Sequence, residues 1–249
     1  MNAITPSLAQ RLAAREKPTT SVVMRQDWSH LLFLHWEVSP AEIQLTLPPG
    51  LFVDTFQSRA YLGIVPFFME KVRPSYCPAI PGISWFQELN LRTYVYDENG
   101  NPGVWFYSLD CNKCLAVKTA RSLFHLPYQH ARMSSEKNGD TLHYTSTRRH
   151  DDVEQVFSYP SQVSSPQTAH PDSLEFFLLE RYRLFSVAKK GQIRSGLVHH
   201  QPYQFQEALV ETYSTQLFPL CGFSPPETAP ISALIAETVS VEIHPLTNN

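Results

Sequence analysis

The sequence contains little glycine, little cysteine and no long hydrophobic run. Nine glycines stand against 20 prolines in 249 residues, which indicates loops that are stiffened rather than loosened. Four irregularly spaced cysteines are too few for the disulfide framework of a secreted protein, so we expect free thiols in a reducing compartment. The longest apolar runs, such as residues 62–69, are too short to cross a bilayer, and residues 1–20 lack a signal-peptide core. These absences predict a soluble, cytoplasmic protein.

Neither sign of charge dominates, and the common catalytic motifs are missing. A formal net charge of −3 without a long basic run argues against nucleic-acid binding. The sequence has no glycine-rich phosphate loop, no nucleophile elbow and no His-Glu-x-x-His helix. The commonest nucleotide-binding, serine-hydrolase and metalloprotease motifs are therefore excluded, and we expect no cofactor.

The composition, 43% apolar and 17% charged, is that of a globular protein. The chain is long enough to bury a core without a metal or disulfide, and it shows neither an internal repeat nor a long linker. We expect one domain over residues 21–249. Residues 7–16 could form a short helix before Pro18, within an N-terminal arm (1–20) that is either mobile or a docking element.

Periodicity and turn chemistry predict a β-rich α+β fold with a few short helices. Strands are expected at 31–38, 59–69, 84–96, 104–109, 128–132, 142–148, 154–159, 180–187, 192–199 and 237–245. Helices are expected at 39–46, where Ser39 would cap and Glu42 would reach back, at 112–124 and at 172–179. Turn residues at 97–103, 138–140 and 189–191 predict antiparallel neighbours, while Pro66 indicates an edge or a bulge.

Several polar residues occur in apolar surroundings. If residues 84–96 are extended, Glu88, Asn90 and Arg92 share one face, and the other face is mostly core. Further polar residues are Arg121 and His125 at a helix end, and Glu180, Arg181 and Tyr182 after another helix. Buried charges must be paired or line a cleft. Two interpretations therefore stay open: a structural network in which Glu88 or Glu180 pairs with an arginine, or a ligand-binding cleft.

Cysteine and histidine spacing gives weak signals. Cys111 and Cys114 have the spacing of a redox pair between a strand and a helix, but the strands before them are expected to be antiparallel rather than part of a βαβ unit. No second Cys or His pair lies at ligand spacing, and His199 and His200 would point to opposite faces of a strand. We therefore expect neither redox chemistry nor a metal site.

Six stretches, residues 31–36, 62–67, 86–95, 103–110, 126–128 and 180–182, resemble the YqjF-like family, also called domain of unknown function 2071. The resemblance runs from about residue 24 to residue 245. That family is grouped with the acetoacetate decarboxylase-like fold. The resemblance therefore implies antiparallel sheets wrapped into a barrel-like or cone-like body around a central pocket.

The resemblance also implies a change of chemistry. The decarboxylase forms an imine between a substrate ketone and a lysine that an adjacent lysine and an apolar site keep neutral. Laid beside the family pattern, residues 120–129 place Tyr128 and Gln129 where the two lysines would be. Arg121 matches the family arginine, and Glu88 falls where a pocket carboxylate is expected. The cavity is thus expected to persist without imine chemistry.

We expect a small-molecule pocket protein, either an enzyme or a former enzyme for a small carbonyl or carboxylate compound. Glu88 would be the general acid or base, and Tyr128 or His125 the proton donor. An anionic ligand would be held by Arg92 or Arg121, with Asn90, Gln129, Glu180 and Arg181 as further binding residues. Two alternatives stay open: a binding protein without turnover, and a partner-binding protein with a vestigial pocket. A homo-oligomer also stays open, and Lys113 and Lys118 are the lysines expected nearest the pocket.

Overall fold

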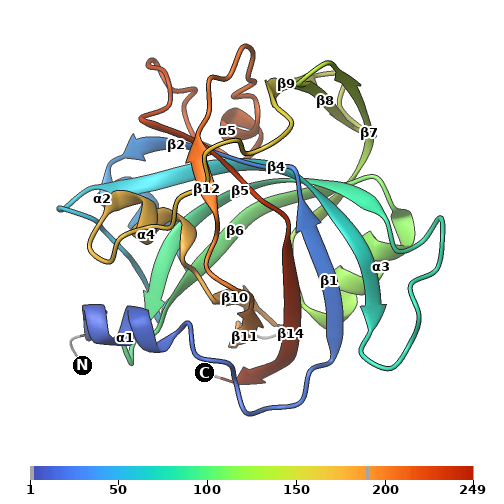
Figure 1. The fold of residues 1–249 in the computed structure, drawn as a ribbon. Coiled ribbons are helices and arrows are strands. Elements are labelled where there is room, and N and C mark those ends of the chain that lie inside the picture. The colour runs from blue at the N-terminus through green and yellow to red at the C-terminus, as the bar shows by residue number, and fades with distance from the viewer. Residues whose placement is uncertain (1–2, 189–190, 249) are drawn as a thin grey trace.

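The computed structural model describes residues 3–188 and 191–248, and within them a single sheet dominates (Figure 1). The sheet has 14 strands among these residues, and five short helices lie around its outside. It is mixed rather than purely antiparallel. The strand-rich fold expected from the sequence is confirmed, while its pairing pattern needs one correction.

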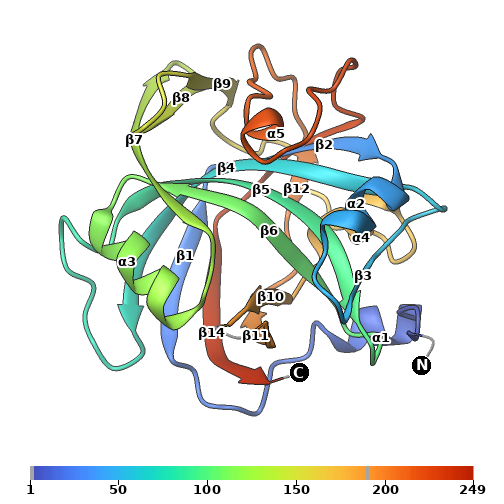
Figure 2. The ribbon, with the colours of Figure 1, turned by 180° about the vertical axis from the view of Figure 1, so that it is seen from behind.

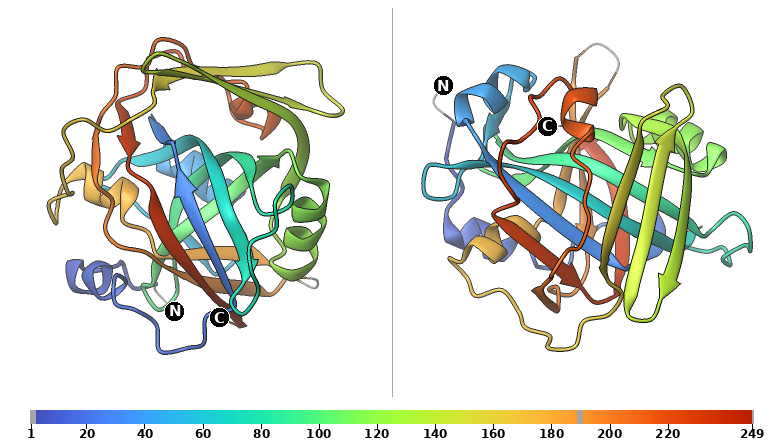
Figure 3. Two further views of the ribbon diagram at one scale, coloured as in Figure 1. Left: turned by 45° about the vertical axis from the view of Figure 1, so that its right-hand side comes forward. Right: turned by 90° about the horizontal axis from the view of Figure 1, so that it is seen from above.

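A closed circuit of hydrogen-bonded strands forms the centre of the fold (Figure 3). The circuit runs through β4 (Ala60–Pro74), β1 (Met24–Ser29), β14 (Val239–Asn248), β11 (Ile193–His199), β10 (Arg183–Val187), β6 (Pro102–Cys111) and β5 (Phe86–Asp97), which pairs with β4 again. The sheet therefore curls into a ring whose inner face can enclose a cavity.

The remaining strands extend this ring on two sides. Beyond β4 lie β2 (Leu31–Val38), β13 (Ser232–Ala236) and β12 (Phe205–Glu207), and β3 (Leu51–Val53) pairs with β5. Beyond β6 lies the antiparallel meander β7 (Tyr128–Asn138), β8 (Thr141–Arg148) and β9 (Glu154–Pro160), which Figure 2 shows standing out from the body. The predicted meander is confirmed, whereas β1, β3, β12 and β13 were not expected.

Strand β6 departs from the expected antiparallel arrangement. It pairs in parallel with β7 and with β10. Helix α3 (Cys114–Leu123) carries the chain from the end of β6 to the start of β7, and such a crossover lets the second strand run in the same direction as the first. The segment that contains Cys111 and Cys114 is therefore a βαβ unit, which corrects the argument made from the sequence.

Proline 66 lies inside β4 without disrupting the sheet. On one side β4 pairs with β2 as far as Ile64 and with β1 only from Phe68 onward. On this side Pro66 falls between the two partners, where a residue without an N–H is tolerated, and on the other side it pairs with Leu89 of β5. The expected irregularity is therefore a change of neighbouring strand.

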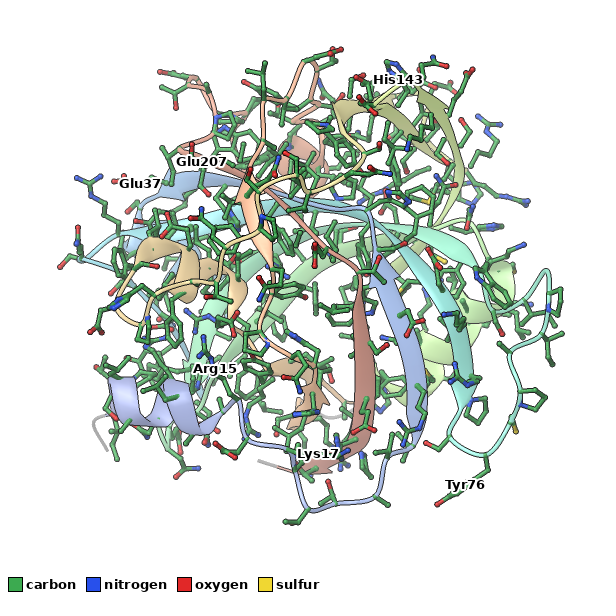
Figure 4. The ribbon with its side chains drawn as sticks, in the orientation of Figure 1. Arg15, Lys17, Glu37, Tyr76, His143 and Glu207 are labelled. Carbon is green, nitrogen blue, oxygen red and sulfur yellow. The ribbon has the colours of Figure 1, made fainter. Side chains whose placement is uncertain are left out.

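The N-terminal arm is docked on the body. Ser7 caps helix α1 (Leu8–Ala13) in a capping box with Gln10. Just after the helix in sequence, Arg15 forms an ion pair of 3.2 Å with Glu180 and lies over the ring of Phe176. Figure 4 shows Arg15 on the side of α1 that faces the body. Through these contacts the segment after α1 packs against the body.

Three further helices are short. They are α2 (Pro40–Thr46), α4 (Leu174–Leu179) and α5 (Leu217–Leu220). Ser173 caps α4 through its side chain, whereas Ser39 makes no side-chain cap hydrogen bond to α2, which corrects that expectation. β10 and β11 pair antiparallel as expected, whereas Lys189 and Lys190 of the turn expected at 189–191 lie outside the described residues. No helix among the described residues is long and apolar enough to span a membrane.

Candidate functional site

A cavity of about 320 Å³ lies between the strands of the ring, with α3 beside it. Most of its wall is apolar and includes Phe67, Met69, Phe86, Phe106, Leu109, Leu126, Leu179 and Val198. A smaller set of polar side chains also lines it: Gln26, Glu88, Arg92, Lys113, Tyr128, Arg181, Arg183 and Tyr203. An apolar pocket with a few converging polar groups is the usual form of a small-molecule site.

Strand β5 contributes two of the polar groups through simple alternation. Phe86, Glu88 and Arg92 line the cavity, whereas Leu89 and Leu91 pack into a separate apolar cluster on the other face. This is the division of faces that the period of two predicts. The fold thus places a carboxylate and a guanidinium in one apolar chamber.

Glu88 and Tyr128 meet inside the cavity. The phenolic oxygen of Tyr128 donates a hydrogen bond of 2.6 Å to Oε2 of Glu88, and both side chains are buried. Asn90 Nδ2 lies 3.5 Å from the other carboxylate oxygen of Glu88. Among the described residues Glu88 has no ion-pair partner, so the structural network considered from the sequence does not include it.

The surroundings of Glu88 favour its protonated form. Burial raises the pKa of the carboxyl to about 7, against the opposing effect of the hydrogen bonds from Tyr128 and Asn90. Burial and the adjacent carboxylate also raise the pKa of Tyr128 well above its ordinary value, so its hydroxyl stays a donor. Glu88 can therefore take up or release a proton near neutral pH.

Two arginines lie elsewhere in the cavity, around the ring of Tyr94. The Cζ atom of Arg92 is 5.7 Å from the ring centroid, and that of Arg181 is 5.0 Å from it. Arg181 also forms an ion pair of 2.7 Å with Asp54, whereas Arg92 has no carboxylate within ion-pair distance among the described residues. Burial lowers the pKa of Arg181 to about 10, which leaves it cationic at neutral pH. This part of the cavity is suited to an anion.

Five residues predicted for the site do not line the cavity. Arg121 is exposed and donates to the backbone oxygen of Tyr128 at 2.6 Å, with Gln129 beside it. His125 follows α3 with a φ of 53°. Asn90 is buried and lies 3.5 Å from Glu88 through its Nδ2 atom, but it is not among the lining residues. Glu180 binds Arg15, the hydroxyl of Tyr182 and the backbone nitrogen of Tyr203, so for Glu180 the structural network is the better description.

Other lining residues escaped the sequence analysis. Gln26 and Trp28 come from β1, whose alternation with Met24 was a readable signal in a segment that was not identified as a strand. Arg183 and Tyr203 also line the cavity, but nothing local distinguishes them from other polar residues. Of the two lysines singled out, Lys113 lines the cavity and Lys118 is exposed.

The cysteine pair has no redox character in this structure. All four cysteines are free thiols, and Cys111 is buried while Cys114 is exposed. Burial raises the pKa of Cys111 to about 12, whereas a reactive thiol needs a lowered value. The βαβ context alone therefore does not make a redox site.

The ring-shaped sheet and its apolar cavity place the chain among proteins of the acetoacetate decarboxylase-like fold. The structure is similar to that of the enduracididine biosynthesis enzyme MppR, with a TM-score of 0.63 and 14% identity, covering 93% of this chain and 88% of the other. It is also similar to acetoacetate decarboxylase from Legionella pneumophila, with a TM-score of 0.61, 11% identity and coverage of 100% and 97%. At such identities the likeness shows the fold alone.

The sequence relationship is more specific. Residues 25–240 match the model of domain of unknown function 2071, described as an uncharacterized conserved protein. The chain is 40% identical over 209 residues to the uncharacterized protein YqjF of Bacillus subtilis, covering 84% of this chain and 86% of the relative. This protein belongs to that family, as its sequence motifs indicated.

Proposed function

We propose that this protein is an enzyme that moves a proton on a small carbonyl compound bearing a carboxylate. Glu88 is the group that takes up and returns the proton, Tyr128 is its hydrogen-bonding partner, and Arg92 binds the carboxylate. The observation that carries the proposal is the buried Glu88–Tyr128 hydrogen bond of 2.6 Å inside a ligand-sized apolar cavity. The pKa of Glu88, raised by burial to about 7, supports its role as a base at neutral pH.

The proposed step is enolisation. Glu88, as the carboxylate, removes a proton from the carbon next to the ligand carbonyl, so the C–H bond breaks and an O–H bond forms on Glu88. The electron pair moves to the carbonyl oxygen, and the hydroxyl of Tyr128 turns from Glu88 to donate to that oxygen. The apolar wall strengthens these interactions because it lowers the local dielectric. Return of a proton from Glu88 to carbon completes the cycle without a cofactor.

Two of the similar structures support a carbonyl ligand by analogy. MppR was solved in complex with pyruvate and with the condensation product of pyruvate and imidazole 4-carboxaldehyde. In the present chain the family's lysine positions hold Tyr128 and Gln129, so the proposal uses proton transfer and hydrogen bonding in place of an imine.

Deuterium exchange tests the proposal. Pyruvate, acetoacetate and longer oxo acids are incubated with the protein in deuterium oxide, and proton NMR follows loss of signal from the carbon beside the ketone. We expect at least one acid to exchange at least tenfold faster with the wild type than with Glu88→Gln. Equal rates for the two proteins with every acid would contradict the proposal.

Binding without turnover is the main alternative. It would use the same arginines, and it would show ligand-induced thermal stabilisation without Glu88-dependent exchange. The raised pKa of Glu88 favours the enzyme, because a carboxylate that merely completes a binding wall gains nothing from titrating near neutrality.

A further inference from the structure

The two polar regions of the cavity are far apart. Glu88 and Arg92 lie on the same face of β5, four residues apart. At about 3.4 Å per residue in an antiparallel strand, this spacing corresponds to about 14 Å between their Cα atoms. The carboxyl group of Glu88 turns toward Tyr128 at one end of this span.

The side chain of Arg92 does not bring its guanidinium group closer to Glu88. Its Cζ atom lies 5.2 Å from the ring centroid of Phe33 and 5.7 Å from that of Tyr94, which follows Arg92 on the strand and is farther from Glu88. Its Nη2 atom is 3.3 Å from the backbone oxygen of Leu178. The guanidinium therefore points along the strand away from Glu88.

Arg181 adds a second cation to this end of the cavity. Its side chain is only 3% exposed, and its Nη2 atom has no hydrogen-bond partner among the described residues. The carboxylate of Asp54 is shared with Arg11, at 2.7 Å from each arginine, so one negative charge serves two guanidinium groups. A buried donor without an acceptor costs free energy, which an anionic ligand would recover.

The wall between the two regions is apolar. On the neighbouring strand β6, Phe106 is opposite Arg92 and Leu109 is opposite Asn90, and both line the cavity. Leu184 and Val198 face it from β10 and β11. These four side chains suit methylene groups.

We infer that the ligand is an elongated oxo acid. Its carboxylate is bound by Arg92 and Arg181 around Tyr94, an apolar carbon chain crosses the middle of the cavity, and a ketone reaches Glu88 and Tyr128. This inference rests on the proposed function and specifies its substrate class. Pyruvate and acetoacetate carry the two groups only one or two carbon–carbon bonds apart, at about 1.5 Å each, and are too short to touch both ends.

A chain-length series tests the inference. Calorimetry compares acetoacetate, 4-oxopentanoate, 5-oxohexanoate, 6-oxoheptanoate and 7-oxooctanoate, which differ in the distance between carboxylate and ketone. We expect affinity to rise at least tenfold from acetoacetate to the best longer acid. Arg92→Met should remove that gain, Arg92→Lys should retain part of it, and Arg132→Met, a change at an exposed arginine of β7, should leave it intact.

Two results would overturn the inference: equal affinities along the series, or an Arg92→Met protein that is folded by circular dichroism and keeps the full gain. These results are distinguishable from failure of the proposed function. Glu88-dependent deuterium exchange of short acids without a length preference would leave the function standing and remove the elongated ligand. A length preference that depends on Arg92, without any exchange, would support the ligand shape and contradict the enzyme.

Discussion

Tyr128 donates a hydrogen bond to Glu88 across an intervening strand. Glu88 is on β5 and Tyr128 on β7, and β6 lies between them, with Cys111 opposite Glu88 and Leu109 opposite Tyr128. The contact depends on the parallel β6–β7 pair, because that pairing brings the start of β7 to the end of β6 that is next to Glu88. A crossover helix thus brings together two residues that are 40 positions apart in sequence.

Replacing Glu88 with Gln should change the pH dependence of stability. The pKa of Glu88 is about 7 in the folded protein, above its ordinary value of 4.5, so between these values the folded state binds more protons than the unfolded state. Ionisation of Glu88 therefore lowers the free energy of unfolding as the pH rises, by up to about 1.4 kcal/mol per pH unit. Urea unfolding should therefore show that the free energy of unfolding of Glu88→Gln rises relative to that of the wild type from pH 4.5 to pH 7.

The free energies of unfolding of the wild type and of Glu88→Gln must be compared with each other at each pH. Burial lowers the pKa of His35 and of His200, which makes stability rise with pH over part of the same range. These histidines are common to both proteins, and their effect cancels in the difference. Glu207→Gln, at an exposed position on β12, is the matched control. A constant difference between wild type and Glu88→Gln would refute the assignment.

Replacing Tyr128 with Phe should raise the pKa of Glu88 above about 7. The hydroxyl donates to the carboxylate and so favours the charged form, and Phe removes that bond with little change in volume. The pH range over which stability falls should extend upward, as measured by urea unfolding. Tyr203→Phe removes another hydroxyl from the same cavity, one without a hydrogen bond to Glu88, and should leave the range unchanged. If Tyr128→Phe and Tyr203→Phe showed the same pH range, that result would contradict the Glu88–Tyr128 hydrogen bond as a determinant of the pKa of Glu88.

Reductive trapping with acetoacetate and borohydride should leave the protein mass unchanged. An imine needs a neutral primary amine facing the ligand, and the sequence comparison predicts Tyr128 and Gln129 where acetoacetate decarboxylase has its two lysines. Lys113 is the lysine that lines the cavity among the described residues, and it is only half-buried. Mass spectrometry after trapping checks the prediction. An adduct that disappears in Lys113→Arg would replace proton transfer with imine chemistry as the leading mechanism.

Replacing Asp54 with Ala should be severely destabilising. Asp54 and Arg181 are almost completely buried, and removal of the carboxylate leaves a guanidinium in the interior without its counter-ion. Losses of about 3–5 kcal/mol are typical of such changes. Arg11→Met, which removes the other partner of Asp54 but leaves the Asp54–Arg181 pair intact, should cost less. Denaturant unfolding of both variants measures the difference, and equal losses would contradict this view of the cluster.

Local signals in the sequence predicted much of the sheet. The apolar run at 31–38 predicted the bounds of β2. Turn residues predicted the hairpins β5–β6 and β7–β8. Short strands such as β3 and β12 lack the length for a periodic signal, and their partners are distant in sequence. The parallel pairing of β6 with β7 follows from how α3 packs, which no local pattern records.

The candidate site was predictable in part. Alternation on β5 placed Glu88 and Arg92 on one face, and the family resemblance pointed to Tyr128. Arg121 was included because it matches the family arginine, and Gln129 because it falls at the second lysine position, but α3 ends so that Arg121 contacts the backbone on the outside. Arg183 and Tyr203 reach the cavity through tertiary packing alone. The sequence thus identified Glu88, Tyr128, Arg92 and Arg181, which line the cavity, and the structure supplied the remaining walls.

Direct titration of Glu88 tests the central claim. With carboxyl carbons of glutamate labelled with carbon-13, the signal that disappears in Glu88→Gln is assigned to Glu88 and followed by NMR from pH 4 to 9. We expect a midpoint at about 7, because the carboxyl group is buried in an apolar cavity with Tyr128 as its closest donor. A midpoint at about 4.5, the ordinary value for glutamate, would show that Glu88 is a solvated carboxylate and would contradict the proposed proton transfer.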